Sequence, residues 1–393
     1  MSNIPSFPLH APIIDNNDKK NITKCLKTGW VSTTGNNINE FEKNISKIIK
    51  SKFVVALNSG TSALHLALKT IGIKENDEVI ISTLTFIAPV NAVKYNGANP
   101  IFMDVDKHLN IDPEKTINFI KNQTYFSKGF SYNKKTKKII RAIILVHVFG
   151  NLCNSNKLIS LCKKRNIECI EDCAESFGSY LRLRNRNKFS GNIGKIGCFS
   201  FNGNKIITSG AGGAIATNSK KIYEKTLYLS KQAKNNQVEF IHNEIGYNYR
   251  MSNLLAALGN SQLLKLEKYI TLKKKIHQNY RLAFTNNDHI ELIKVPNYSE
   301  SNYWINVIDI DFYFYNKKNL KQLILYLIKN KIYVRPLWFL NHLQKPFLKN
   351  QSYKIENANK LIHRCLCLPS SPNLSKKNII YISKMIINYL DDK

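Results

Sequence analysis

The first half of the chain alternates short apolar runs with amphipathic stretches. Apolar runs predict strands at 53–57, 78–83, 100–105, 141–148, 168–172, 197–201 and 213–217. Amphipathic stretches at 61–71 and 88–95 predict helices between the first of these strands. Strands that are apolar along nearly their whole length are typical of a sheet buried on both faces. This half therefore predicts an α/β fold in which βα units cover a mostly parallel sheet.

The pattern changes at two places further along. Residues 120–140 are a polar insert with several aromatic residues, which predicts a surface hairpin. From Met251 a long helical stretch carries apolar residues three and four apart, such as Leu263, Leu266 and Ile270. It leads to a predicted αβ unit with strands at 304–310 and 332–335 and a helix at 320–329. We expect a large cofactor-binding domain at 1–250, whose N-terminal segment can pack on the small domain, and a linking helix with a small domain at 251–393.

Length and apolar runs exclude several classes of protein. A chain of 393 residues can bury a full core and is too long for a small structural module. No apolar run reaches the roughly 20 residues that span a bilayer, and residues 1–14 lack the apolar region of a secretory signal. We therefore expect a cytoplasmic protein with no membrane partner.

The formal net charge of +31 raises the alternative of a basic nucleic-acid-binding protein. The lysines, however, are spread over nearly every segment and do not form a basic stripe interleaved with aromatic residues. We therefore expect no nucleic-acid partner. A positive field can still attract a substrate that carries a diphosphate.

The eight cysteines are scattered and include no Cys-x-x-Cys pair. This spacing indicates buried thiols in a reducing compartment and no metal site. Cys365 and Cys367 are two residues apart, which predicts that both side chains lie on one face of a strand.

Lys205 ends the run Ser-Phe-Asn-Gly-Asn-Lys, just past a predicted strand and before a loop of small residues at 209–213. An enzyme that uses pyridoxal 5'-phosphate (PLP) needs a lysine whose amine can leave water, form an imine with the cofactor aldehyde and later shuttle a proton. Lys205 fits that need. With 58 Lys and Arg in the chain, a lysine beside glycines is weak evidence alone, and its neighbours decide.

Asp172 closes the predicted strand 168–172, at the end of a strand where α/β sheets bind ligands. There it can lie under the pyridine nitrogen of PLP and keep it protonated, which makes the ring an electron sink. Glu175, three residues on, can face the same cavity and contact the cofactor's phenolic oxygen or the substrate imine. The alternative for such a carboxylate is a solvated turn or a helix N-cap.

A third segment, Asn58 to Leu64, runs from a strand through small residues into a helix. Free backbone N–H groups from Gly60 onward, with the Thr61 and Ser62 hydroxyls, would make an anion site suited to the cofactor phosphate. The alternative is a plain N-capped helix. No lysine follows at the spacing of a Walker loop.

Two further side chains are candidates for the same pocket. Phe86, just past a strand end, can stack on the pyridine ring, although a single phenylalanine is more often core. His147, at the end of the strand predicted at 141–148, is a candidate for the pocket floor. A buried histidine with satisfied hydrogen bonds is the favoured interpretation of His147.

With these motifs in this order, followed by the run Gly-Tyr-Asn-Tyr-Arg-Met-Ser-Asn at 246–253, the chain resembles the DegT/StrS family of nucleotide-sugar aminotransferases over about its whole length. The resemblance implies a fold-type-I PLP-dependent transferase, with helices on both faces of a mostly parallel sheet and a smaller C-terminal αβ subdomain. More narrowly, the motifs at 28–32, 147–150, 200–208 and 301–304 look like the branch that acts in legionaminic acid and bacillosamine synthesis.

The resemblance also implies roles for individual residues. Lys205 would be the Schiff-base lysine and acid/base, and Asp172 would pair with the pyridinium. Thr61, Ser62 and Ser200 would bind the phosphate. Asn248 would join them from a second subunit, so the active unit would be a homodimer with shared sites.

Glu175 departs from the family pattern, because many relatives carry Gln or His there. Its role, in proton transfer or in sugar contact, stays open. Lys205 distinguishes the chain from a sister group that has His in place of the lysine and dehydrates the sugar at C3.

The implied reaction has two halves. L-Glutamate converts PLP to its amine form, and that amine then passes to C4 of a nucleotide-linked 4-keto-6-deoxy (acetamido) sugar, with Lys205 delivering the proton. Trp30, Arg250 and His342 are candidates for substrate contact, with surface or core packing as the alternative for each. A non-catalytic sensor on the same fold is a further alternative, which the intact lysine and aspartate disfavour.

Overall fold

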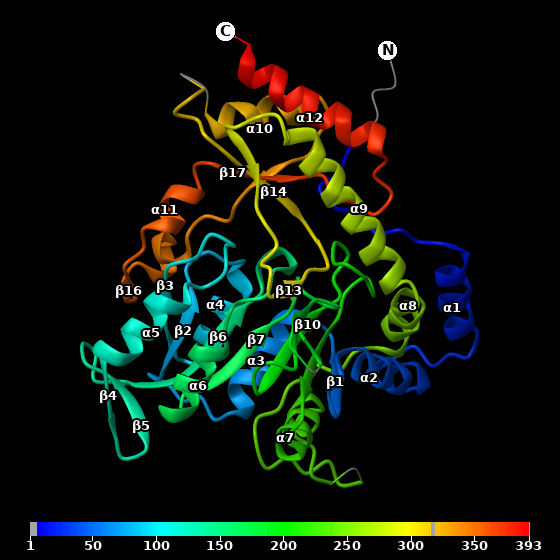
Figure 1. Ribbon diagram of the computed structural model, residues 1–393. Helices are drawn as coiled ribbons and strands as arrows, with labels where there is room; N and C mark the ends of the chain where they lie inside the picture. Colours follow the sequence, from blue (N-terminus) through cyan, green and yellow to red (C-terminus); the bar gives the residue numbers. More distant parts are fainter. Residues whose placement is uncertain (1–5, 185, 237, 316–318, 393) are drawn as a thin grey trace.

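A computed structural model of the chain describes residues 6–184, 186–236, 238–315 and 319–392. Its centre is a 10-stranded sheet in the order β1-β11-β10-β7-β6-β2-β3-β16, with the hairpin β4-β5 joined to β6 through β5 (Figure 1). The strands are β1 (Phe53–Leu57), β2 (Glu78–Ser82), β3 (Asn99–Met103), β4 (Thr124–Ser127), β5 (Phe130–Asn133), β6 (Ile139–Val146), β7 (Glu168–Asp172), β10 (Ile196–Ser200), β11 (Gly213–Thr217) and β16 (Ser352–Tyr353).

The central sheet is mostly parallel, as predicted. From β10 through β7, β6, β2 and β3 to β16, every neighbouring pair is parallel. Strand β11 runs antiparallel to both β1 and β10. The insert at 120–140 forms the predicted hairpin, and β5 also pairs antiparallel with β6. The parallel strands therefore bring their carboxyl ends to one edge of the sheet.

Alternate residues of the central strands face two different apolar cores. In β2, Val79 and Ile81 face a core that includes α3 (Gly60–Thr70) and α4 (Ile87–Tyr95). Ile80 faces the opposite core, with α5 (Pro113–Asn122) and α6 (Asn156–Lys164). Both faces of the sheet are covered, which explains why most of its strands are apolar along nearly their whole length.

The remaining helices of this part are α1 (Asn16–Lys27), α2 (Asn36–Ile49), α7 (Lys220–Ser230) and α8 (Asn253–Leu263). Helix α8 packs against α1 and α2 at one side of the molecule (Figure 1). A small three-stranded sheet is made by β8 (Tyr180–Arg182), β9 (Asn187–Phe189) and β13 (Ser299–Glu300). Among the residues described, no helix combines the length and the apolar character needed to cross a bilayer.

The C-terminal part is built on a second sheet in the order β12-β14-β17-β15. Its elements are α9 (Leu266–Phe284), β12 (Ile290–Leu292), β14 (Asn306–Ile310), α10 (Leu320–Lys329), β15 (Arg335–Pro336), β17 (Cys365–Leu368) and α12 (Lys376–Asp391). Short segments complete the chain: η1 (Val148–Gly150), η2 (Asn341–Leu343), η3 (Lys345–Phe347) and α11 (Asn357–Leu361).

Strand β17 shows the alternation that its sequence predicts. Cys365 and Cys367 lie in the apolar core that includes the central sheet, whereas Leu366 and Leu368 lie in the core of α9, α10 and α12. The prediction that the two cysteines share one face of a strand is therefore confirmed.

Two predictions for this region were wrong in detail. The long helical stretch after Met251 is two helices, α8 and α9, because the chain turns at the exposed Leu264 so that α8 packs on α1 and α2 and α9 on α12. The strand predicted at 332–335 begins only at Arg335. Ile332 pairs instead with Phe7 of the N-terminal segment, whose backbone bonds to Lys331 and Tyr333.

Candidate active site

A cavity of about 690 Å³ lies at the carboxyl ends of β6, β7 and β10, where elements of the C-terminal part meet the central sheet. Seven residues predicted from sequence for the cofactor site line it: Gly60, Thr61, Phe86, Asp172, Glu175, Ser200 and Lys205. They come from five separate segments, which the parallel sheet brings to one edge.

The start of α3 forms one wall of the cavity. Ser59 is its N-cap, and its hydroxyl accepts a hydrogen bond from the Ser62 backbone N–H at 3.0 Å. The first N–H groups of a helix have no partner within the helix, so those of Gly60 and Thr61 suit an anion. A Cβ at position 60 would lie 2.8 Å from the Ser200 Cβ, so glycine allows the helix start to approach the end of β10 closely.

Ser62 lies differently from the prediction. Its backbone N–H is held by Ser59, and its hydroxyl donates to Asn58 Oδ1 at 2.7 Å. The side chain is buried and is not part of the cavity lining. Its polar groups stabilise the turn that presents Gly60 and Thr61.

Lys205 projects into the cavity from the loop between β10 and β11. Its side chain is 12% exposed, and its Nζ lies 3.7 Å from Glu175 Oε1. The same Nζ lies 4.1 Å from the ring centroid of Trp304. The lysine that carries the functional hypothesis is therefore close to one carboxylate and one aromatic face.

Asp172 is buried at the end of β7, and its Oδ1 accepts a hydrogen bond from the Ala174 N–H at 3.0 Å. Burial raises the pKa of this carboxyl above its ordinary value, while the Ala174 N–H and the nearby Lys205 oppose the rise. A cationic partner such as a pyridinium would stabilise its charged form.

Glu175 is also buried, and its Oε2 accepts a hydrogen bond from the Phe149 N–H at 2.8 Å. Burial raises the pKa of Glu175 to about 7, although Lys205 and the Phe149 N–H lower it. Near neutral pH this side chain can therefore exchange a proton.

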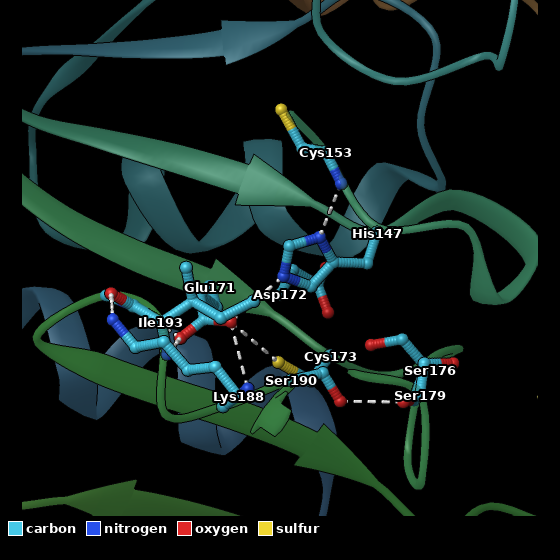
Figure 2. A network of polar contacts seen from close by, with 12 residues as sticks. His147, Cys153, Glu171, Asp172, Cys173, Ser176, Ser179, Lys188, Ser190 and Ile193 are labelled. Atoms are coloured by element: carbon cyan, nitrogen blue, oxygen red, sulfur yellow. Dashed lines mark hydrogen bonds and ion pairs between the residues drawn. The ribbon is translucent and has the colours of Figure 1, made fainter. Parts of the chain in front are cut away.

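His147 lies in a buried polar network behind Asp172, shown in Figure 2. Its Nδ1 accepts from the Cys153 N–H at 3.3 Å, so the hydrogen is assigned to Nε2, which donates to Glu171 at 3.0 Å. The His147 backbone N–H donates to the Asp172 carbonyl at 3.1 Å. The structure supports the interpretation of His147 as a buried histidine with satisfied hydrogen bonds.

Glu171 in the same network is close to His147 and Cys173, and potential metal-ligand atoms of these three residues lie within 4.8 Å of one another. Its carboxylate also accepts hydrogen bonds from the backbone N–H groups of residues 191, 193 and 194. These donors, with His147, account for both carboxylate oxygens, so Glu171 acts here as a hydrogen-bond acceptor for the protein itself (Figure 2).

The residues of the cavity fit PLP. An anion site at the start of α3, a buried carboxylate at Asp172 and an amine at Lys205 match the phosphate, the ring nitrogen and the aldehyde of that cofactor. Phe86 is 55% exposed, so its ring can be covered by a ligand. The buried Thr85 hydroxyl lacks a hydrogen-bond partner and belongs to the same lining.

Besides Ser62 and His147, four residues predicted for the site lie outside the cavity of this chain. Arg250 is buried, and its Nη1 donates to Glu42 Oε1 at 2.7 Å and to the Ala56 carbonyl at 3.0 Å. His342 Nδ1 bonds to the Thr83 hydroxyl at 2.7 Å. For both residues the packing alternative describes the single chain, because Arg250 Nη1 and His342 Nδ1 already form hydrogen bonds within it.

Asn248 and Trp30 are exposed on the surface instead. Asn248 lies in the segment before α8, where its carbonyl accepts from the Asn58 side chain. Trp30, 62% exposed, lies beside a separate surface hollow next to α1 and α2. Neither reaches the cavity of its own chain.

Sequence reasoning missed part of the cavity wall. The cavity is also lined by residues that were not predicted for it: Leu9, Phe149, Trp304, Arg335 and Trp338. The run Arg-Pro-Leu-Trp at 335–338 was the sequence feature that could have indicated this part of the wall. Its proline interrupts a strand, and a cation and an aromatic residue lie on either side of that proline. Nothing in the sequence pattern placed this run in the same cavity as Lys205, because the two segments lie far apart in the chain.

Comparison with known proteins agrees with this geometry. A sequence model of the DegT/DnrJ/EryC1/StrS aminotransferase family matches residues 12–387. The chain is 34% identical over 387 residues to a GDP-perosamine synthase from Escherichia coli O157:H7, covering 98% of this chain and 99% of the relative. It is 29% identical to a UDP-4-amino-4,6-dideoxy-N-acetyl-beta-L-altrosamine transaminase from Campylobacter jejuni, covering 96% of each.

Among solved structures, the chain is similar to Helicobacter pylori PseC, an aminotransferase involved in the biosynthesis of pseudoaminic acid. The TM-score is 0.87 at 23% sequence identity, covering 99% of this chain and 100% of the other. The fold-type-I architecture expected from the sequence is confirmed.

Proposed function

Because the chain belongs to the DegT/DnrJ/EryC1/StrS aminotransferase family, we propose that it moves an amino group from L-glutamate to C4 of a nucleotide-linked 4-keto-6-deoxy sugar. As a member of this family it is a PLP-dependent aminotransferase of nucleotide sugars. The observation that carries the proposal is the meeting of Lys205, Asp172 and the start of α3 around one cavity.

We assign the cofactor contacts as follows. The N–H groups of Gly60 and Thr61, with the Thr61 and Ser200 hydroxyls, hold the phosphate. Asp172 holds the ring nitrogen in its protonated form. When bound, PLP supplies an electron sink for the carbon that gains or loses the amine.

Lys205 is the residue that binds the cofactor and moves the proton. Its amine would move a proton from the donor carbon to the cofactor in the first half-reaction, and from the cofactor to C4 of the acceptor in the second, which sets the stereochemistry at C4. Binding of the distant nucleotide orients the reacting carbon toward Lys205. Glu175, with its pKa about 7 and its Oε1 3.7 Å from Lys205 Nζ, can exchange protons with that amine.

We propose a homodimer in which each subunit completes the site of the other. The exposed Asn248 and Trp30 are the residues that would reach the partner's cavity, which explains why neither lies in its own. Asn248 follows a segment with strongly exposed apolar side chains, among them Val238, Phe240 and Ile245. Such side chains suit burial against a second copy.

The identity of the sugar has two candidates. The motifs around residues 28–32 and 301–304 support an acetamido sugar of legionaminic acid or bacillosamine synthesis. The 34% identity to a GDP-perosamine synthase supports a GDP-linked 4-keto sugar instead. Turnover on a panel of UDP- and GDP-linked 4-keto sugars, with NMR of each product, separates the two. The cytoplasmic location expected from the sequence remains a prediction.

Borohydride reduction tests the central claim. The purified protein should be yellow, should bleach when glutamate is added, and after reduction should carry the cofactor on the peptide that contains Lys205. A Lys205→Ala variant should be colourless at the same protein concentration and inactive. Label on another lysine, or normal transamination by the variant, would contradict the proposal.

A further inference from the structure

The ammonium of Lys205 and the indole of Trp304 form a contact that has no role in the reaction proposed above. The Nζ lies 4.1 Å from the ring centroid, within the range of a cation–π interaction. Trp304 is only 5% exposed, so the contact is largely shielded from water. Shielding from water strengthens a cation–π contact, because fewer water molecules compete with the ring for the cation.

The indole is held in this orientation by hydrogen bonds at two points. Its Nε1–H donates to the carbonyl of Asn204, the residue before Lys205, at 2.7 Å. The backbone N–H of Trp304 donates to Asn302 Oδ1 at 3.0 Å. The ring is therefore hydrogen-bonded to the loop that carries the lysine.

Asn302, in the segment that carries Trp304, also contacts the segment that carries the carboxylate near the amine. Asn302 Nδ2 donates to the backbone carbonyls of Glu175 at 2.9 Å and of Phe177 at 3.1 Å. The Phe149 N–H holds Glu175 Oε2, which leaves Oε1 facing Lys205 at 3.7 Å. Asn302 thus sets the spacing between the aromatic face and the carboxylate.

We propose that Trp304 and Glu175 form a holding site for the Lys205 ammonium, occupied in the part of the cycle when the lysine is not joined to the cofactor. The inference rests on the proposed role of Lys205 as the cofactor lysine. Trp304 is then a positioning residue, because it acts on the reaction only through Lys205.

Such a site answers a physical need of the reaction. A lysine side chain that is not bonded to the cofactor has four rotatable bonds. Between the two half-reactions it would sample many rotamers and would not stay directed at the reacting carbon. An aromatic face attracts the ammonium without accepting its proton, so the side chain stays in place until the acceptor arrives. Glu175, whose Oε1 lies 3.7 Å away, can then take that proton and leave the amine free to act as a base. The carboxylate opposite adds charge complementarity.

The test measures Lys205 directly in the amine form of the holoenzyme, prepared with L-glutamate and desalted. Trace labelling with acetic anhydride over a pH series, read by peptide mass spectrometry, gives the pH midpoint of the Lys205 amine. Trp304→Leu should lower this midpoint by about one pH unit, a tenfold change in the ratio of ammonium to amine. Trp304→Phe, which keeps a weaker ring face, should give a smaller shift in the same direction.

Two further variants sharpen the result. Trp338→Leu is the matched control, since Trp338 lines the same cavity but stacks on Phe149 at 4.8 Å. It should leave the Lys205 midpoint unchanged. Glu175→Gln keeps the acceptor for the Phe149 N–H and removes the charge, so it should lower the midpoint.

The inference is overturned if Trp304→Phe and Trp304→Leu both keep the wild-type midpoint, or if Trp338→Leu shifts it equally. Trp304→Phe retains bulk, so it serves if Trp304→Leu fails to fold. Borohydride mapping distinguishes a failure of the holding site from a failure of the proposed function. A cofactor fixed on Lys205 with unmoved midpoints refutes the holding site alone, whereas a cofactor absent from Lys205 refutes the proposed function.

Discussion

Two carboxylates three residues apart face the same cavity, and their surroundings give them different roles. Asp172 is held by the Ala174 N–H at the end of a strand, whereas Glu175 is held by the Phe149 N–H and points at Lys205. Burial raises the pKa of both. The first is placed to hold a cation of the cofactor and the second to exchange protons with the lysine.

Glu175 predicts a pH dependence of stability in the cofactor-free protein. Its folded pKa of about 7 lies above its ordinary value of 4.5, so the folded state holds this proton where the unfolded state has lost it. Stability should therefore fall as pH rises from about 4.5 to 7, by roughly 2 to 4 kcal/mol from this group. Glu175→Gln should remove that part of the slope, as measured by urea unfolding at a series of pH values. Parallel curves for the two proteins would show that the group titrates normally.

Gly60 gives a second prediction at this scale. In Gly60→Ala the new methyl group would lie 2.8 Å from the Ser200 Cβ, so the start of α3 must move away from β10. We expect a loss of stability of roughly 1 to 3 kcal/mol and weaker cofactor binding. Gly203→Ala is the control, because the atom nearest to a Cβ at position 203 is the Gly210 carbonyl oxygen, at 3.9 Å. Thermal unfolding and absorbance titration with PLP measure both effects, and equal behaviour of the two variants would argue against the close approach.

At the scale of elements, a buried ion pair joins α2, β1 and the segment before α8. Arg250 Nη1 lies 2.7 Å from Glu42 Oε1, and the two side chains are 8% and 17% exposed. Glu42 Oε1 also accepts from the Ala56 N–H in β1. The pair therefore fixes the segment that carries Asn248 against the edge of the central sheet.

Removing one partner of this pair should be costly. Arg250→Met leaves the Glu42 carboxylate without its cation, and we expect a loss of about 3 to 5 kcal/mol in the free energy of unfolding. The double variant with Glu42→Gln should recover much of that loss, which a double-mutant cycle measures. Lys220→Met serves as control, because the exposed Lys220–Glu224 pair should contribute about 0 to 1 kcal/mol. A fully stable Arg250→Met protein with impaired turnover would instead support substrate contact by Arg250.

At the scale of the whole molecule, the shared-site dimer predicts complementation between inactive subunits. Lys205→Ala and Asn248→Ala homodimers should each be impaired. In a mixed dimer both defects can fall on one site and leave the other intact, so random mixing should restore about a quarter of the wild-type sites. Light scattering establishes the dimer, and activity after co-refolding measures the restoration. Activity equal to the average of the two homodimers would mean that each site is built within one chain.

Local patterns were enough to predict much of the fold. Four elements have the bounds predicted from the sequence: β1 at 53–57, β7 at 168–172, β11 at 213–217 and α10 at 320–329. They are predictable because strands buried on both faces, such as β1, are largely apolar, and because α10 has an apolar stripe at helical spacing. The break between α8 and α9 was not predictable, since both halves continue one helical pattern and only their packing partners separate them.

The sequence by itself determined the chemistry that this protein can carry. Lys205, Asp172 and the small residues from Ser59 to Ser62 are local motifs, each set by the end of a strand or the start of a helix. Only the tertiary structure decided which side chains share a space. It placed Trp304 and Arg335 in the cavity wall and engaged Arg250 and His342 elsewhere. The physical reason is that a motif depends on neighbours along the chain, whereas a cavity depends on contacts between distant segments. Asn204 and Trp304, for example, are separated by 100 positions.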